Sequence, residues 1–241
     1  MVKCAKWKNF WKTNKRSAVM SIYEREQLRT VFGGALRPGG VAVTQAALDI
    51  CAFAVPSHLL DVGCGTGETL RFLMEKGFEA CGLDISSKLL EEASQYGPVV
   101  RGDFHDLPWT DSHFDGVFCE CSLCLARDRK AVISECGRVL KANGRLVISD
   151  IFVKGGAENL KPDHSSGPVT LSCLSTLLKG CGFQIVAEVD FEKALKELAA
   201  RLIWHFGSGD ILKTLWSSDG CNACETGSLT YSLVIAEKTG F

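Results

Sequence analysis

Three glycines at alternate positions form the most specific ligand-binding pattern in the chain. The segment Asp61-Val62-Gly63-Cys64-Gly65-Thr66-Gly67 includes the end of the apolar run His58–Val62. Glycines spaced in this way directly after a buried strand let a ligand approach the backbone closely. A dinucleotide would need a small residue at the next position, beside its phosphates, but Glu68 places a negative charge there. The loop therefore disfavours NAD.

A carboxylate at the end of the next predicted strand complements this loop. Asp84 lies 21 residues after Gly63, where a carboxylate can accept hydrogen bonds from both hydroxyls of a ribose. A turn glycine or a surface aspartate would each be unremarkable alone. Together they predict a site for an adenosine-type cofactor without phosphates.

Two C-x-x-C pairs among the 12 cysteines could also do chemistry. Cys121 and Cys124 follow a predicted strand, and Cys221 and Cys224 precede the last one. If the pairs converge, they could hold Zn²⁺ tetrahedrally, bind a soft metalloid such as arsenic(III), or mark a thiol or selenium acceptor site. Redox use and plain structural burial are the alternatives. Structural burial is the prediction for six others: Cys51, Cys64, Cys81, Cys136, Cys173 and Cys181.

Several side chains are candidates for proton transfer to or from an acceptor. Cys121, Cys124, Glu120 and His164 are the catalytic candidates, and Asp150, His105 and His205 are further ones. A surface position is the alternative for each histidine.

Alternating strands and helices must position these groups. Strands are predicted at His58–Val62, Glu79–Leu83, Val99–Arg101, Phe114–Cys119, Gly144–Ile151, Phe183–Val189 and Ser228–Glu237. Helices are predicted from Val41 and over Ser87–Gln95, Arg127–Leu140 and Val169–Gly180, with one or two more over Phe191–Trp216. This pattern predicts an α/β fold with a doubly wound seven-stranded sheet, mostly parallel, whose last strand is antiparallel. Lys154–Pro168 is predicted to be a loop or lid, and Trp204, Phe206 and Trp216 to pack in the core or line an acceptor pocket.

Length and charge limit the remaining possibilities. The 241 residues, 46% hydrophobic with a net charge of -1, predict one main domain over residues 41–241 and disfavour a duplex nucleic-acid binder. Residues 1–40 are predicted to be a basic helical N-terminal segment, with weak membrane-surface contact as an alternative role. The expected location is cytoplasmic, with reduced thiols, since we find neither a spanning apolar run nor a secretory signal.

Residues Leu59 to Phe152 resemble the class I S-adenosylmethionine-dependent methyltransferases, particularly the small-molecule, type 11 group related to ubiquinone-biosynthesis and arsenite methyltransferases. The resemblance is carried by LLDVGCGTGETL, GLDIS, GDFHDLPW, FDGVF and RVLKANGRLVISD. It implies a Rossmann-like fold and S-adenosylmethionine as cofactor. One departure is Lys141-Ala142-Asn143-Gly144, where the family usually has Lys-Pro-Gly-Gly; asparagine also tolerates a turn.

The resemblance also implies roles for individual residues. Asp61, Gly63 and Gly65 would hold the methionine end, Asp84 and Ile85 the ribose and one adenine face, and Asp103 and Phe104 the adenine. Cys64, Gly67 and Cys119 complete the predicted cofactor-binding set, and Arg37 and Thr44 are candidates to reach the cofactor from above. The expected function is methyl transfer to a small-molecule acceptor, which could be a thiol, selenium or arsenic compound near Cys121, Cys124, Cys221 and Cys224. The alternative is a non-catalytic S-adenosylmethionine- or zinc-binding module of a redox or biosynthetic complex.

Overall fold

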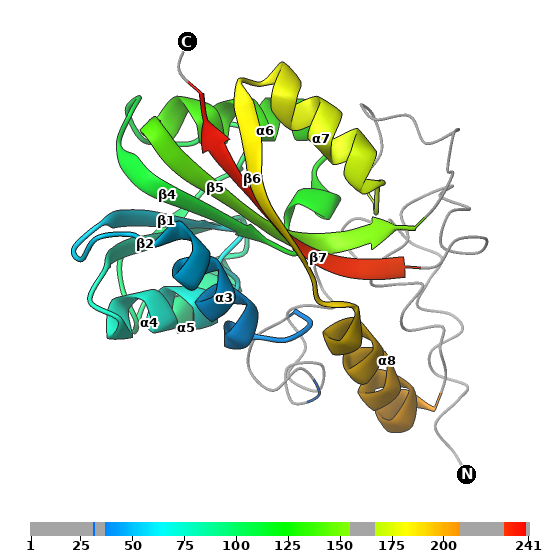
Figure 1. Ribbon diagram of the computed structural model, residues 1–241. Helices are drawn as coiled ribbons and strands as arrows, with labels where there is room; N and C mark the ends of the chain where they lie inside the picture. The colour runs from blue at the N-terminus through cyan, green and yellow to red at the C-terminus, as the bar shows by residue number, and fades with distance from the viewer. Residues whose placement is uncertain (1–30, 32–36, 155–166, 208–228, 240–241) are drawn as a thin grey trace.

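A single twisted sheet with helices on both faces organises the chain (Figure 1). The computed structural model describes residue 31 and residues 37–154, 167–207 and 229–239. Within these residues the sheet has seven strands in the order β3-β2-β1-β4-β5-β7-β6. The strands are β1 (His58–Val62), β2 (Glu79–Asp84), β3 (Val99–Arg101), β4 (Phe114–Glu120), β5 (Leu140–Val153), β6 (Phe183–Asp190) and β7 (Leu229–Lys238).

The strand directions confirm the predicted topology. Strands β1 to β5 pair in parallel, and β7 runs antiparallel to both β5 and β6. Because parallel strands end at the same edge, Asp61, Asp84, Glu120 and the residues after Arg101 all lie at one edge of the sheet. This edge is where the topology of a doubly wound sheet places a ligand.

Helices cover the two faces in the alternating pattern of the strands. The helices are α3 (Val41–Cys51), α4 (Glu68–Glu75), α5 (Ser87–Ala93), α6 (Arg129–Val139), α7 (Leu171–Gly180) and α8 (Glu192–Phe206), with a 3₁₀ turn η2 at Leu123–Leu125. Leu59, Phe118 and Val147 pack with apolar residues of α3, α4 and α8, whereas their neighbours Leu60, Val117 and Leu146 pack with α6 and α7. Period-two alternation along the strands thus supplies both cores.

Short polar side chains set the beginnings of three helices. The side chains of Ser86, Asp128 and Thr170 accept hydrogen bonds from the backbone N–H groups of Leu89, Ala131 and Cys173, capping α5, α6 and α7. Helices α6 and α7 therefore begin two residues later than predicted. The fifth strand begins four residues earlier than predicted, at Leu140, and Asn143 within it has a φ of 61°, the conformation expected from its tolerance of turns.

One prediction about the C-terminal aromatics is wrong. Of its two predicted roles, core packing is excluded for Trp204, because this side chain is 92% exposed on α8. The buried face of α8 is formed instead by Leu195, Leu198 and Leu202, and Trp204 does not share their helical phase. In the described part of the chain, no helix is both long and apolar enough to cross a membrane.

Candidate cofactor and acceptor site

Left-handed glycines build the loop between β1 and α4. Gly63, Gly65 and Gly67 have φ values of 77°, 54° and 84°, a region that is costly for residues with a Cβ. The N–H groups of Gly63 and Cys64 both donate to the carbonyl of Leu83 on β2, at 2.7 and 3.0 Å. A Cβ on Gly63 would lie 2.7 Å from the Cβ of Ser122. The loop is therefore held tightly between the ends of β2 and β4.

Asp84, the predicted ribose-binding residue, ends β2. Its side chain is buried, and Oδ2 accepts the N–H of Gly65 at 2.9 Å while Oδ1 accepts that of Ser86 at 2.8 Å. A carboxylate oxygen can accept more than one hydrogen bond, so a carboxylate at this position is chemically suited to hydroxyl donors. Ile85, the next residue, is 44% exposed and offers an apolar surface beside the carboxylate.

Asp103 and Phe104 lie beyond β3, on the far side of Asp84 from the glycine loop. Burial alone would raise the pKa of Asp103, but hydrogen bonds from the backbone and ring of His105 and the charge of Arg127 hold it below its usual value. The rings of Phe104 and His105 stack with centroids 4.8 Å apart. An ionised carboxylate beside an aromatic face is suited to binding a planar base that carries an amino group.

On the other side of the loop, a buried ion pair occupies the end of β4. Nη2 of Arg37 lies 2.9 Å from Oε2 of Glu120, and the two side chains are only 7% and 2% exposed. The hydroxyls of Thr44 on α3 and Thr69 on α4 donate to the same carboxylate, at 3.1 and 2.6 Å. Arg37 and Thr44 were candidates to reach the cofactor, and the structure places both on Glu120.

Asp61 is the least satisfied carboxylate in this cluster. Its Oδ2 is buried and makes no hydrogen bond with the residues that the structure describes. Burial, together with the charges of Glu120 and Asp84, raises the pKa of Asp61 to about 8, and Arg37 only partly opposes them. One arginine thus faces several carboxylates, which makes the cluster a suitable place for an incoming cation.

Two thiols follow β4, of which Cys124 is buried and Cys121 is half-buried. Burial, followed by the charge of Asp150, raises the pKa of Cys121 and of Cys124 well above the ordinary range of a thiol. The backbone N–H of Cys124 donates to Oδ2 of Asp150 at 2.8 Å. Cys121 has a φ of 51° and its sulfur lies 3.8 Å from the hydroxyl of Tyr231. This Cys121–Cys124 turn joins β4, β5 and β7 at the edge next to the glycine loop.

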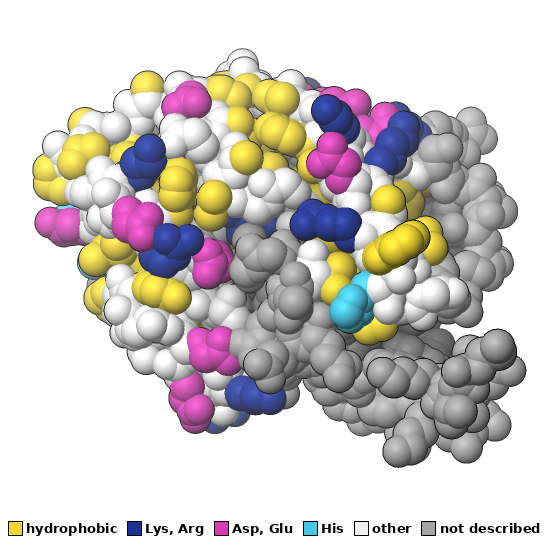
Figure 2. All heavy atoms as spheres, turned by 90° about the horizontal axis from the view of Figure 1, so that it is seen from below, with side chains coloured by type: hydrophobic (Ala, Val, Ile, Leu, Met, Phe, Trp, Pro, Cys, Tyr) yellow, Lys and Arg dark blue, Asp and Glu magenta, His cyan; other side chains and the backbone are white. Residues whose placement is uncertain are grey.

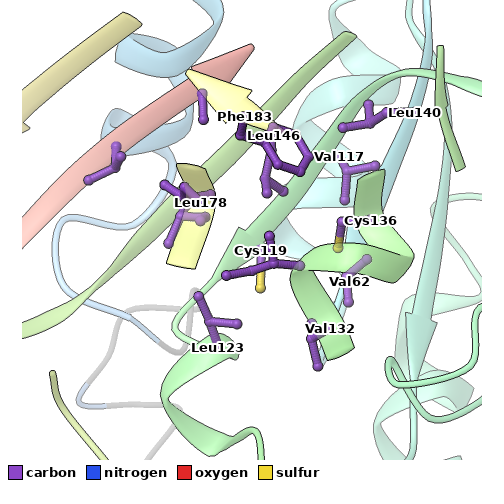
Figure 3. Close-up of a cluster of buried hydrophobic side chains, with 14 of the residues drawn as sticks. Val62, Val117, Cys119, Leu123, Val132, Cys136, Leu140, Leu146, Leu178 and Phe183 are labelled. Atoms are coloured by element: carbon purple, nitrogen blue, oxygen red, sulfur yellow. The ribbon is translucent and has the colours of Figure 1, made fainter. Parts of the chain in front are cut away.

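Other cysteines belong to the core. Figure 3 shows Cys119 and Cys136 among aliphatic side chains such as Val62, Val117 and Val132, between the sheet and α6. Cys136 was predicted to be a small buried hydrophobe, and its position in this core agrees with that prediction. Cys119 was predicted to bind cofactor, and its thiol instead packs in this cluster, 3.0 Å from the hydroxyl of Ser122.

Several of the remaining candidates are not placed by the structure. His164, Cys221 and Cys224 lie outside the described residues, so the predicted convergence of the two cysteine pairs stays a prediction. Among the described residues, no group of three or more His, Cys, Asp or Glu side chains could hold a metal ion. His205 is exposed near the end of α8. In the view of Figure 2, basic and acidic side chains are interspersed and form no single basic patch.

The arrangement defines a Rossmann-like protein whose glycine loop and carboxylates gather at the carboxyl edge of its sheet. Residues 60–148 match the family model described as a methyltransferase domain. The chain is 30% identical over 172 residues to the uncharacterized methyltransferase YodH of Bacillus subtilis, covering 66% of this chain and 73% of that protein. It is 42% identical over 102 residues to a demethylmenaquinone methyltransferase of Thermotoga maritima, covering 40% and 44%. The chain belongs to the class I S-adenosylmethionine-dependent methyltransferase family.

Two further findings bear on how far this relationship extends. The chain spans about half the length of several curated relatives that it matches, between 44% and 57% of each. Among solved structures, the [4+2]-cyclase SpnF has a TM-score of 0.74 with 20% identity, covering 95% of this chain and 97% of that one. A shared fold of this kind does not by itself establish which reaction is catalysed.

Sequence reasoning missed how the site is held together. Thr69 was not singled out, and the contact between Arg37 and Glu120 joins residues 83 positions apart. No periodicity or motif links such positions. The only signal available was the charged Glu120 directly after the apolar run Val117 to Cys119.

Proposed function

We propose that the chain transfers a methyl group from S-adenosylmethionine to a small-molecule acceptor. The observation that carries this proposal is the row of carboxylates along the sheet edge, Asp103, Asp84, Asp61 and Glu120, in the order β3-β2-β1-β4. Adjacent strands are about 4.8 Å apart. Adenine, ribose and the methionine end can therefore be bound in that order by successive strands.

The residues present suit each part of the cofactor. Asp103 and Phe104 would receive the adenine, and Asp84 with Ile85 the ribose. The backbone of Gly63, Cys64, Gly65 and Gly67 would lie against the methionine end. Oδ2 of Asp61, which has no hydrogen-bond partner among the described residues, would accept a hydrogen bond from the ammonium group of the cofactor. A buried carboxylate needs such a partner.

The bound cofactor supplies an electrophilic methyl group on a sulfonium. The next position along the edge is the turn from Cys121 to Cys124, with Asp150 behind it. We place the acceptor there, because the strand order leaves this turn directly beyond the methionine end. The role of the protein would be to orient the acceptor and exclude water.

Within this proposal, a hydroxylated soft acceptor such as arsenite or selenite fits the two thiols of Cys121 and Cys124. Each neutral thiol can condense with one hydroxyl of such a compound, forming a bond from sulfur to the metalloid and releasing one water. A resident zinc ion would instead require both thiols to lose their protons, which burial and Asp150 oppose. Cys221 and Cys224 are the proposed further ligands of the acceptor.

We also propose that residues 1–40 form a cap over this edge, preceding a methyltransferase domain over residues 41–241. The burial of Arg37 against Glu120 supports this proposal, since it attaches the last part of the segment to the end of β4. A cap of this kind would keep water from the acceptor.

The proposal is tested by turnover. Purified, reduced protein is incubated with cofactor labelled in its methyl group and with arsenite, selenite, small thiols, a quinol precursor or simple amines. We expect a methylated product together with an equal amount of demethylated cofactor. Tight cofactor binding without turnover of any acceptor would support the non-catalytic module instead.

The soft-acceptor proposal is tested by matched cysteine variants. Cys121→Ser and Cys124→Ser should each reduce transfer to arsenite or selenite by at least about tenfold. Cys181→Ser is the control, because its half-buried sulfur contacts the Ser134 hydroxyl at 3.5 Å, away from the site. Equal activity of all three variants on a soft acceptor would contradict a role for the turn thiols.

A further inference from the structure

His105 holds one oxygen of Asp103 from two directions. Its ring Nδ1 lies 2.6 Å from Oδ1 of Asp103, and its backbone N–H donates to the same oxygen at 3.0 Å. The other oxygen, Oδ2, has only Arg127 near it, at 3.9 Å, among the charged side chains that the structure describes. The two carboxylate oxygens therefore have different roles, one fixed within the loop and one left to accept.

A third contact sets the tautomer of the ring. The backbone N–H of Asp128 donates to Nε2 of His105 at 3.4 Å. A nitrogen that accepts cannot carry the proton, so the neutral ring carries it on Nδ1 and donates to Asp103. Stacking on Phe104, with rings inclined by 21°, fixes the ring plane. The imidazole thus connects the loop after β3 to the residue that caps α6.

We propose that His105 is a positioning residue that makes the cofactor site selective for a 6-amino purine, by fixing Asp103 so that its free Oδ2 accepts from the exocyclic amine. The inference rests on the proposed function, because it assigns adenine to the Asp103 end of the edge.

The selectivity follows from the hydrogen-bonding capacity of the two partners. An ionised carboxylate oxygen only accepts hydrogen bonds, so it pairs with a 6-amino group and faces a 6-oxo group as an unfavourable contact between acceptors. Sites built to hydrogen-bond one polar group reject the analogue that lacks it, provided that their own group is held in place. A carboxylate free to rotate could turn away, and the discrimination would fall.

Two substitutions separate the contacts of His105. Asparagine places its amide nitrogen close to the position of Nδ1, so His105→Asn keeps a donor to Asp103 and loses the contact with Asp128. Glutamine reaches the position of Nε2, so His105→Gln keeps an acceptor for Asp128 and loses the donor to Asp103. A merely structural role would not distinguish the two variants in their choice of purine.

The experiment measures calorimetric affinities of the full chain for S-adenosylhomocysteine and for its inosine counterpart, which carries a 6-oxo group. We expect the wild type and His105→Asn to prefer the adenine compound by at least about tenfold. His105→Gln should bring the ratio close to one, as should Asp103→Ala. Melting temperatures check that each variant is folded.

The possible outcomes distinguish a failure of the role of His105 from a failure of the proposed function. If the wild type binds neither compound, the proposed function fails and this inference fails with it. If the wild type discriminates and His105→Gln discriminates equally, the cofactor assignment survives and the role of His105 is overturned. Loss of selectivity in His105→Asn but not in His105→Gln would also overturn it.

Discussion

Asp84 connects the cofactor loop to the predicted ribose position, so its removal should have two effects. Asp84→Ala leaves the N–H groups of Gly65 and Ser86 without their side-chain acceptor. It also removes the proposed acceptor for the ribose hydroxyls. We expect cofactor binding to weaken by about 1.5 to 3 kcal/mol, the scale for a hydrogen bond to a charged group. Calorimetry with S-adenosylhomocysteine measures this change.

An exposed carboxylate provides the control for Asp84. Asp106→Ala alters a residue whose side chain is exposed in the loop after β3, and its affinity should match that of the wild type. Denaturant titrations of both variants separate a loss of loop stability from a loss of binding. An unchanged affinity in Asp84→Ala would refute the ribose assignment.

Asp61 should give the folded protein a characteristic dependence on pH. Burial raises its pKa to about 8, from an ordinary value of 3.8. Between these values the folded state binds a proton that the unfolded state has lost. The contribution to stability is therefore complete below about pH 4 and is lost as pH rises through 8, with a slope of up to about 1.4 kcal/mol per pH unit.

The neutral isostere Asp61→Asn isolates this effect. Asparagine resembles the protonated acid and should fold, but it cannot titrate. The free energy of unfolding of the wild type, measured by urea titration from pH 5 to 8, should therefore decrease relative to that of Asp61→Asn as pH rises. Parallel pH profiles for the two proteins would mean that Asp61 is ionised throughout this range.

At the scale of elements, the approach of α4 to α5 depends on one glycine. Gly67 precedes α4 with a φ of 84°, and a Cβ there would lie 2.8 Å from the Cβ and 2.9 Å from the Cα of Ala93 on α5. Gly67→Ala combines left-handed strain with a shift of the α5 backbone. We expect a loss of about 1 to 3 kcal/mol in unfolding free energy, measured by denaturant titration.

Gly180 offers a matched control within another helix. It ends α7, and a Cβ added to it would meet no heavy atom within 4 Å. Gly180→Ala should be neutral or slightly stabilising, because alanine has the higher helix propensity. If the two variants lost equal stability, the close contact at Gly67 would not be the cause.

The elements were predictable where one local signal controlled them. His58–Val62 and Val99–Arg101 have the predicted bounds, since turn residues flank each apolar run. The starts of α6 and α7 were predicted two residues too early, because the capping residues Asp128 and Thr170 were counted as part of each helix. Trp204 was wrongly assigned because an aromatic residue was given weight over the phase of α8.

At the scale of the whole molecule, strand order was predictable only through the family resemblance. The resemblance implied a Rossmann-like fold, and the structure has the strand order β3-β2-β1-β4-β5-β7-β6. The polar contacts at the carboxyl edge were not predictable. The ion pair of Arg37 with Glu120 depends on how α3 packs on the sheet, which no local pattern encodes.

Cofactor choice should be visible in the stability of the whole molecule. A ligand that binds only the folded state stabilises it by about 2.7 kcal/mol at a concentration of 100 times its Kd. For a domain of this size that corresponds to a rise of roughly 5 to 11 °C in Tm. We expect S-adenosylmethionine to raise the Tm in this way, in a thermal scan with increasing ligand.

NAD provides the contrasting ligand in the same scan. Glu68 begins α4, with Arg71 paired to it at 2.8 Å, at the helix start where a pyrophosphate would have to bind. Its carboxylate would repel the phosphates, so NAD should leave the Tm unchanged at concentrations where S-adenosylmethionine has saturated its effect. Glu68→Ala tests whether the Glu68 carboxylate is the cause. S-adenosylmethionine has no phosphate, so it should raise the Tm of this variant no less than that of the wild type. A larger shift with NAD in the wild type would mean that the glycine loop binds a dinucleotide, and the order of subsites along the sheet edge would have to be reassigned.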